Sequence, residues 1–400
     1  MSPSTTEATV ESVSVASTTT QTHVLTADYL GAPYGTTSVS ATEAHPYLSW
    51  ASIGVPNANA YHAAGLQTEW YTSPDRTAPS DPLVSMVAPS AYSTTCGGDR
   101  VYTTYAGLSM HMMDPGSSSL QTNYRSLVAS RTAGAAIDAL YEDNAVQPGY
   151  YSSSTWIPGM PCSYSDAAWI AAEKKLESSA GKDTIVNGLS SITETGVAQL
   201  VQVVEDNPST IGGNFESCFN TTGQPAEGVW VWTETEQTQI DVVGHDKYFQ
   251  CMGSDTSDAS LEPAGRIFTL ASFLMTYAPS RSILWERFST PDGFHVLPES
   301  GLVALDPLVA QPTSIASLKT STDTYVREYS ACYYRGKLVG ACAMVVNSDR
   351  ASHPRPTLKQ TYHHTLVVSG AGALDGGSVS FSGAAPPSTM AALSAFIALP

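Results

Sequence analysis

The chain has 400 residues, of which 42% are hydrophobic, and this composition supports a large folded core and excludes global disorder. Lys and Arg total 18 against 36 Asp and Glu, which gives a net charge of -18 and argues against nucleic acid or anionic lipid as a partner. Charged residues make up only 14%, so Ser, Thr, Gly and Tyr fill the surface, which suits contact with neutral polar polymers. The alternative is an acidic surface that serves solubility alone.

The first segment, residues 1–36, is rich in Ser and Thr and shows little periodicity, so we expect a mobile leader or linker. It contains no basic region followed by an apolar run, so no signal peptide is visible, and we expect any secretion signal to have been removed already. No stretch of the chain is long and apolar enough to span a bilayer, which argues against membrane insertion.

After the leader, short apolar strands alternate with amphipathic helices, which is the pattern of a parallel α/β sheet. Ser117 or Ser118 can cap a helix after the third strand, and Thr233 with Glu236 forms a capping box before the seventh. Eight such strand-and-helix units predict a (β/α)8 TIM barrel over residues 37–311. The eight expected strands cover residues 47–54, 66–71, 105–114, 136–144, 184–189, 214–219, 248–252 and 282–288.

The pattern changes after about Pro312, where runs of alternating polar and apolar residues are separated by turns rich in Gly, Asn and Pro. Such runs are typical of antiparallel strands. We therefore expect a small C-terminal antiparallel β-sandwich over residues 312–400, packed against the barrel. The expected strands are Tyr325–Tyr334, Lys337–Val346, His364–Val368 and Ser378–Phe381.

The six cysteines have an even count and suggestive positions. Two flank a short turn and would face each other across a hairpin, two lie near the ends of neighbouring barrel strands, and two remain in long loops. Three disulfides would place the protein in an oxidising compartment, secreted or at the cell surface, whereas six buried thiols in a cytosolic enzyme are the alternative. No Cys or His cluster has the spacing of a zinc site, so we expect no metal. The expected pairs are Cys96–Cys162, Cys218–Cys251 and Cys332–Cys342.

Two of the expected strands, 136–144 and 214–219, carry candidate acids for the barrel rim, Asp143 and Glu216. In a barrel, side chains at the carboxyl ends of the strands converge on the substrate. Cleavage of a glycosidic bond requires one protonated acid and one ionised carboxylate. The sequence therefore predicts Asp143 and Glu216 as the catalytic pair, with Glu216 as general acid and Asp143 as nucleophile or base, or with these roles exchanged. Glu142 has the opposite side-chain parity and is expected to point elsewhere.

Further substrate contacts are expected from polar and aromatic side chains near other strand ends. Sugar faces stack on aromatic rings, which favours tryptophans in the cleft. Each residue also has a structural alternative, since acids and amides form turns or bond to the backbone, Glu216 can be an ion-pair partner, and tryptophan fills cores. The expected substrate-binding residues are Glu69, Trp70, Asp114, Asn144, Asn187 and Trp232.

The fourth strand also resembles a known family. The run Ala136–Asn144 matches the motif Gly-Phe-Asp-Gly-Val-Phe-Leu-Asp-Asn without a gap, with alanine for both glycines and Glu142 for the leucine. That motif is typical of hypothetical glycoside-hydrolase (β/α)8 barrels related to the endo-α-1,4-polygalactosaminidase clan. The resemblance covers roughly residues 45–310 and implies that Asp143 is the strand-four carboxylate and Asp138 a structural acid. The supporting positions are Asp114-Pro115-Gly116, Arg125, Asn187-Gly188 and Glu216.

The sequence as a whole predicts a secreted glycoside hydrolase that cleaves O-glycosidic bonds of an oligo- or polysaccharide with two carboxylates and no cofactor. A non-catalytic carbohydrate-binding or surface-structural protein on the same scaffold is the alternative, because fold alone does not decide function. The chain has no Gly-x-Gly-x-x-Gly after a strand, no Walker-type lysine loop and no Gly-x-Ser-x-Gly elbow, which argues against nucleotide binding and esterase activity.

Overall fold

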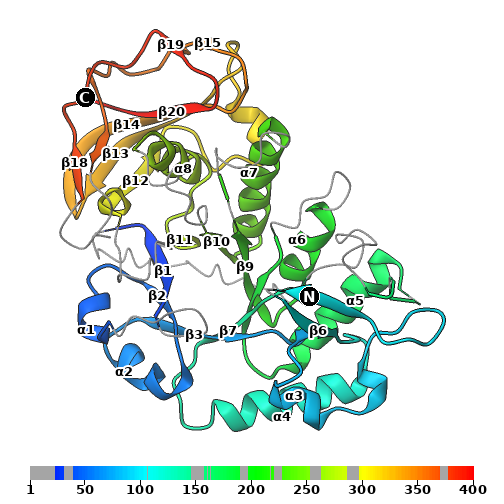
Figure 1. Ribbon diagram of the computed structural model, residues 1–400. Coiled ribbons are helices and arrows are strands. Elements are labelled where there is room, and N and C mark those ends of the chain that lie inside the picture. The colour runs from blue at the N-terminus through cyan, green and yellow to red at the C-terminus, as the bar shows by residue number, and fades with distance from the viewer. Residues whose placement is uncertain are drawn as a thin grey trace, which may run out of the picture.

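Eight parallel strands close into a barrel in the computed structural model of the protein (Figure 1). The structure describes residues 23–30, 39–105, 107–145, 157–159, 161–162, 164–189, 197–216, 218–219, 228–252, 263–285, 297–369 and 377–400. Around the barrel the strand order is β1-β11-β10-β9-β8-β7-β3-β2. These strands are β1 (Leu25–Tyr29), β2 (Trp50–Ser52), β3 (Gln67–Thr72), β7 (Ala139–Glu142), β8 (Thr184–Asn187), β9 (Thr210–Glu216), β10 (Tyr248–Met252) and β11 (Ser282–Trp285).

The first barrel strand, β1, lies inside residues 1–36, for which the composition predicts a mobile leader, so that prediction is wrong for Leu25–Tyr29. Ala27 and Tyr29 belong to the barrel interior, but Thr26 and Asp28 on the other side of the strand are buried as well. A strand that is buried on both faces shows no alternation of polar and apolar residues. The sequence signal of β1 is therefore weak.

The strand expected over residues 105–114 exists as β6 (Leu108–Met112), but its expected place in the barrel is wrong. It pairs antiparallel with β4 (Arg76–Thr77) and β5 (Tyr102–Tyr105) in a three-stranded sheet that is inserted between β3 and α4 (Ser118–Arg131). A local pattern predicts that a segment is a strand, but it does not specify which strand will be its neighbour.

Helices follow the barrel strands and cover the outside of the barrel (Figure 1). The Ser117 hydroxyl accepts a hydrogen bond from the Leu120 amide and caps α4, as expected. The capping box of Thr233 and Glu236 is wrong, because α7 already begins at Gly228. No helix in the described part of the chain is long and apolar enough to cross a membrane. The other helices are α1 (Ala41–Ala44), α2 (Ala58–Ala63), α3 (Pro82–Met86), α5 (Asp166–Ser179), α6 (Val197–Glu205), α7 (Gly228–Gly244) and α8 (Pro263–Met275), with 3-10 turns η1 (Val55–Asn57), η2 (Pro89–Ala91), η5 (Pro298–Gly301) and η6 (Ile315–Leu318).

The C-terminal part forms a five-stranded antiparallel sheet in the order β12-β13-β14-β20-β16, with two short ladders, β15–β19 and β17–β18. The expected C-terminal antiparallel sheet is thus present, and a sandwich of two facing sheets stays a prediction. The sheet already begins with β12, before residue 312. Its strands are β12 (Leu302–Pro307), β13 (Tyr325–Tyr334), β14 (Lys337–Asn347), β15 (His353–Pro354), β16 (His364–Thr365), β17 (Val367–Ser369), β18 (Ser378–Ser380), β19 (Thr389–Met390) and β20 (Ser394–Leu399).

Helix α8 joins the barrel to the C-terminal sheet (Figure 1). One hydrophobic core runs from Phe249 in the barrel wall through Phe273 on α8 to Met344 on β14. The Tyr329 hydroxyl donates to the carbonyl of Leu274 at 2.6 Å, and both residues are buried. Because the two parts share this core, the sheet and the barrel bury each other's apolar surface.

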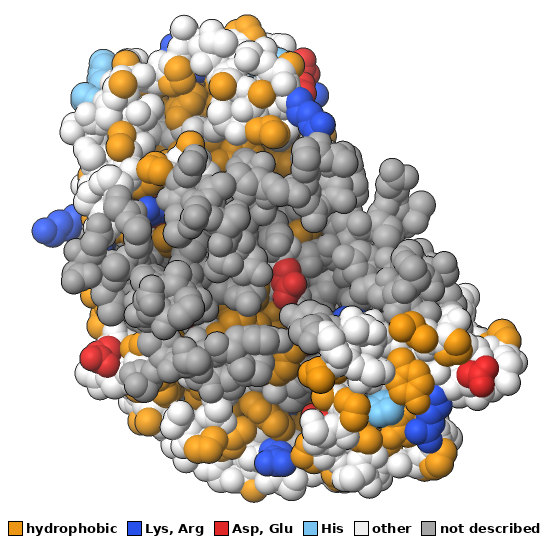
Figure 2. Space-filling view, viewed as in Figure 1, with side chains coloured by type: hydrophobic (Ala, Val, Ile, Leu, Met, Phe, Trp, Pro, Cys, Tyr) orange, Lys and Arg blue, Asp and Glu red, His pale blue; other side chains and the backbone are white. Residues whose placement is uncertain are grey.

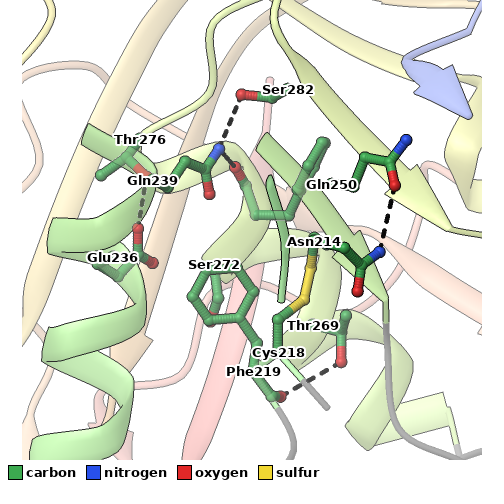
Figure 3. The surroundings of a disulfide bond; sticks show 12 residues. Asn214, Cys218, Phe219, Glu236, Gln239, Gln250, Thr269, Ser272, Thr276 and Ser282 are labelled. Carbon is green, nitrogen blue, oxygen red and sulfur yellow. Dashed lines mark hydrogen bonds between the residues drawn. A yellow bond between two sulfur atoms is a disulfide. The ribbon is translucent and has the colours of Figure 1, made fainter. Parts of the chain in front are cut away.

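All three expected disulfides are present: Cys96–Cys162, Cys218–Cys251 and Cys332–Cys342. The first connects the loop before β5 to the loop after β7. The second, shown in Figure 3, connects the end of β9 to β10. The third joins β13 to β14 across their hairpin, so the pairing deduced from strand positions is confirmed.

Candidate active site

Three polar side chains meet where the neighbouring strands β7, β8 and β9 end. Asp143 follows β7, Asn187 ends β8, and Glu216 ends β9. The Nδ2 nitrogen of Asn187 donates to Oδ1 of Asp143 and to Oε1 of Glu216, at 2.8 Å each. Those two carboxyl oxygens are therefore no more than twice 2.8 Å apart. The structure brings the two predicted acids together, because parallel strands of a barrel end on one rim.

The side chains at this rim differ in exposure. Asn187 is buried, Asp143 is half-buried, and Glu216 is exposed. The backbone amide of Asp143 donates to the carbonyl of Thr72 at 2.8 Å, which fixes the first residue beyond β7 against β3. The pair is thus anchored by its strands and remains accessible to water.

The strand that carries Glu216 is held closely by its neighbour. A Cβ atom on Gly212 would lie 2.6 Å from the Tyr248 carbonyl of β10, so only glycine permits this approach. Asn214 points into the barrel and donates to Gln250 of β10 at 3.3 Å (Figure 3). Cys218, two residues beyond Glu216, is cross-linked to β10. These contacts fix the backbone that presents Glu216.

A further residue at the site, Tyr71 of β3, was not among those that the sequence predicts. Its hydroxyl donates to Oδ2 of Asp143. The ring stacks on Tyr141 with centroids 6.0 Å apart. The alternation of side chains along a strand could have identified Tyr71. It lies on the same inner side of β3 as Glu69 and nearer to the carboxyl end of the strand.

Glu69 and Trp70 lie away from the mouth, which corrects their expected role in substrate binding. Glu69 is fully buried inside the barrel and accepts a hydrogen bond from Gln250 at 3.1 Å. Burial raises the pKa of its carboxyl to about 8. Trp70 has the opposite parity and packs outside the barrel wall with the cluster that contains Leu66 and Leu140. A position near a strand end therefore did not show that Glu69 points into the barrel interior and Trp70 to the outside of the barrel.

Trp232 is also displaced from the mouth, because it lies on α7 rather than on a strand or loop. Its ring nitrogen donates to the Ser272 hydroxyl at 2.8 Å, and its ring packs on Tyr325 of the C-terminal sheet with centroids 4.6 Å apart. The side chain is buried, which explains its role as a packing residue between α7, α8 and the sheet.

Asp114 and Asn144 both hold loops near the rim. Oδ1 of Asp114 accepts hydrogen bonds from the Gly116 amide, at 2.9 Å, and from the Tyr164 hydroxyl. Asn144 has a left-handed backbone with φ of 69° and donates to the Ser73 hydroxyl at 3.1 Å. These bonds account for both side chains structurally, and substrate contact by either stays a prediction.

A second acidic group, which we call the buried acid cluster, consists of Asp75, Glu142 and Glu173. All three are at most 1% exposed. Burial raises the pKa of Asp75 and of Glu142 to about 8 and that of Glu173 well above its ordinary value, and the charge of Asp75 adds to the rise for Glu142 and Glu173. The Tyr124 hydroxyl donates to Oε1 of Glu142. Burial therefore favours the protonated form of these carboxyls.

The charge of Asp143 contributes to the raised pKa of Asp75, so the buried acid cluster lies close behind the rim. Within the described ranges no group of three or more His, Cys, Asp or Glu residues is arranged to hold a metal ion. The face shown in Figure 2 carries few charged side chains among its described residues, in keeping with the low charge content of the chain. The rim thus offers a carboxylate pair with the buried acid cluster close behind it.

No protein-family model and no curated protein matches the chain. Among solved structures, Ega3 of Aspergillus fumigatus in complex with galactosamine is similar with a TM-score of 0.41 and 12% identity, over 66% of this chain and 91% of that one. A GH27 β-L-arabinopyranosidase of Geobacillus stearothermophilus has a TM-score of 0.43 and 11% identity, over 86% and 77%. The glycoside hydrolase domain of PelA from Pseudomonas aeruginosa has a TM-score of 0.41 and 8% identity, over 66% and 94%. These similarities are distant, and the site stands on the geometry described above.

Proposed function

We propose that the protein is a glycoside hydrolase that cleaves O-glycosidic bonds of an oligo- or polysaccharide with Asp143 and Glu216. The observation that carries this proposal is the position of Asn187, whose amide nitrogen lies 2.8 Å from an oxygen of each acid. Two carboxyls at one water-accessible rim can act on opposite sides of a glycosidic bond. The low content of charged residues in the chain, 14%, suits a neutral or weakly charged sugar.

The separation of the two carboxyls supports cleavage with retention of configuration. Retaining enzymes place them about 5–5.5 Å apart, whereas inverting enzymes leave roughly 6.5–9.5 Å for a water molecule. The oxygens bound to Asn187 are at most twice 2.8 Å apart, which fits the retaining arrangement. In the retaining reaction, Asp143 bonds to the anomeric carbon while the bond to the leaving oxygen breaks, and Glu216 gives that oxygen its proton. Glu216 then takes a proton from the water that releases the sugar.

The exposure of the two acids supports this division of roles. Glu216 is exposed, so it can exchange its proton with water between the two steps. Asp143 is half-buried and accepts hydrogen bonds at both oxygens, which stabilises its negative charge. The three disulfides suit an oxidising compartment, so we place the activity outside the cell or at its surface.

The test is hydrolysis of a panel of polysaccharides and aryl glycosides by the wild type, Asp143→Asn and Glu216→Gln. We expect both variants to lose activity on polysaccharide by about 10²- to 10⁴-fold. Glu216→Gln should retain more activity on aryl glycosides with good leaving groups, since these need little acid assistance. NMR of the first product should show retained anomeric configuration. Full activity in both variants would refute the assignment, and glycan binding without turnover by the wild type would favour a binding protein.

A further inference from the structure

Tyr71 connects the aromatic interior of the barrel to the carboxylate pair. Its hydroxyl donates to Oδ2 of Asp143, on the side away from Asn187. Asp143 is therefore held at both oxygens, by a phenol from β3 and by an amide from β8. We infer that Tyr71 is a positioning residue, which fixes the orientation and the negative charge of Asp143, an inference that rests on the proposed function.

The ring of Tyr71 is itself held in place. Tyr71 pairs in register with Tyr141 of β7, and the two rings stack at an angle of 21°. Tyr141 in turn packs against Tyr29, at 5.8 Å between ring centroids, and against Trp285, at 5.6 Å. Tyr141 and Trp285 are fully buried, so the ring of Tyr71 rests on packed neighbours that leave it little freedom.

An aspartate carboxyl rotates easily about its last side-chain bond, because that torsion has a broad energy minimum. A hydrogen bond from Asn187 to one oxygen leaves this rotation open, whereas a second bond from Tyr71 to the other oxygen restricts it. Hydrogen bonds to a carboxylate also favour its charged form. Tyr71 thus acts through Asp143, whose oxygen must be aligned with the anomeric carbon and ionised when the sugar binds.

The variant Tyr71→Phe removes the hydroxyl and keeps the stacked ring. We expect kcat on aryl glycosides to fall about ten- to hundredfold with little change in KM, which is the range for a hydrogen bond to a charged group. The acidic limb of the pH–rate profile should move to higher pH, because Asp143 would bind its proton more readily. Tyr102→Phe is the matched control: it removes a hydroxyl from a half-buried tyrosine of β5, in the inserted sheet, and should change neither quantity.

A second measurement does not depend on hydrolysis. The carboxyl ¹³C signal of Asp143, assigned by its loss in Asp143→Asn, should titrate at higher pH in Tyr71→Phe than in the wild type or Tyr102→Phe. If the wild type hydrolyses no glycan, the proposed function fails, and this titration still decides whether Tyr71 acts on Asp143. An unchanged titration in Tyr71→Phe would overturn the inference even if hydrolysis is confirmed. So would an unchanged acidic limb with a loss that appears only in KM.

Discussion

Glu142 and Asp143 are neighbours in the chain, yet they belong to two acidic groups with opposite environments. Asp143 is half-buried at the rim and accepts hydrogen bonds from Tyr71 and Asn187. Glu142 points to the other side of β7, is fully buried, and carries a pKa that burial raises to about 8. Neighbouring residues of a strand point to opposite sides. Here Asp143 therefore points to the rim, whereas Glu142 points into a buried site that favours its protonated form.

The two groups are also held in different ways. The carboxylate pair is fixed by donors, Asn187 and Tyr71, and by the disulfide that follows Glu216. The buried acid cluster lies beside α4 and α5, which carry Tyr124 and Glu173, and the Tyr124 hydroxyl donates to Glu142. Hydrogen-bond donors around a carboxylate stabilise its negative charge, whereas burial away from water disfavours that charge. Three sets of variants test whether the two groups act separately.

The largest effect should come from neutralising one acid of each group separately. Asp143→Asn should reduce kcat on polysaccharide by about 10²- to 10⁴-fold and leave the fold intact. Glu142→Gln should keep kcat within a few fold, because that side chain already carries a proton and faces away from the rim. Steady-state kinetics with thermal unfolding as a folding control measures both. A Glu142→Gln variant that is folded and inactive would show that the two groups are not separate.

The next effect concerns the disulfide beside Glu216. Replacing Cys218 and Cys251 by alanine opens a loop with a sequence separation of 33 and should lower the free energy of unfolding by about 4 kcal/mol. It should also lower kcat, because Glu216 loses an anchor two residues away. Replacing Cys332 and Cys342, which join a hairpin of the C-terminal sheet, is the control and should leave kcat unchanged. Denaturant unfolding and kinetics at a temperature where all variants are folded would test this. Equal kcat losses in both double variants would contradict it.

The smallest effect is a pH dependence of stability that arises from the buried acid cluster. Glu142 has an ordinary pKa of 4.5 and a folded-state pKa of about 8, so between these values the folded protein binds a proton that the unfolded chain has lost. Stability from this group is therefore complete at low pH and falls as the pH rises toward 8.

Glu142→Gln removes this proton, so its melting temperature should fall less than that of the wild type between pH 5 and pH 8. The difference should correspond to a few kcal/mol or less, measured by calorimetry across the pH range. Asp143→Asn serves as the control from the carboxylate pair. Parallel curves for the wild type and Glu142→Gln would show that Glu142 is ionised in the folded protein.

Much of the barrel could be predicted because its strands are short apolar runs between helices. The strand Tyr248–Met252 agrees to the residue. The strand Leu25–Tyr29 was missed because both of its faces are buried. The strand β6 was assigned to the barrel because a local pattern does not show which strands a segment will pair with. The errors at Trp70 and Trp232 have a related cause. An aromatic residue near a strand end is equally suited to the cleft and to packing, and only the direction of its side chain decides.

The sequence by itself determined most of the barrel strands, which cysteines pair, and that Asp143 and Glu216 stand near strand ends, since these properties follow from local periodicity and from the order of elements. The tertiary structure decided that Asn187 bridges the two acids and that Tyr71 reaches Asp143, which lies 72 residues further along the chain. It also decided that Glu142 is buried, which raises the pKa of its carboxyl to about 8. Closure of the barrel sets these distances and the burial of each carboxyl, and closure depends on contacts between segments that no local pattern records.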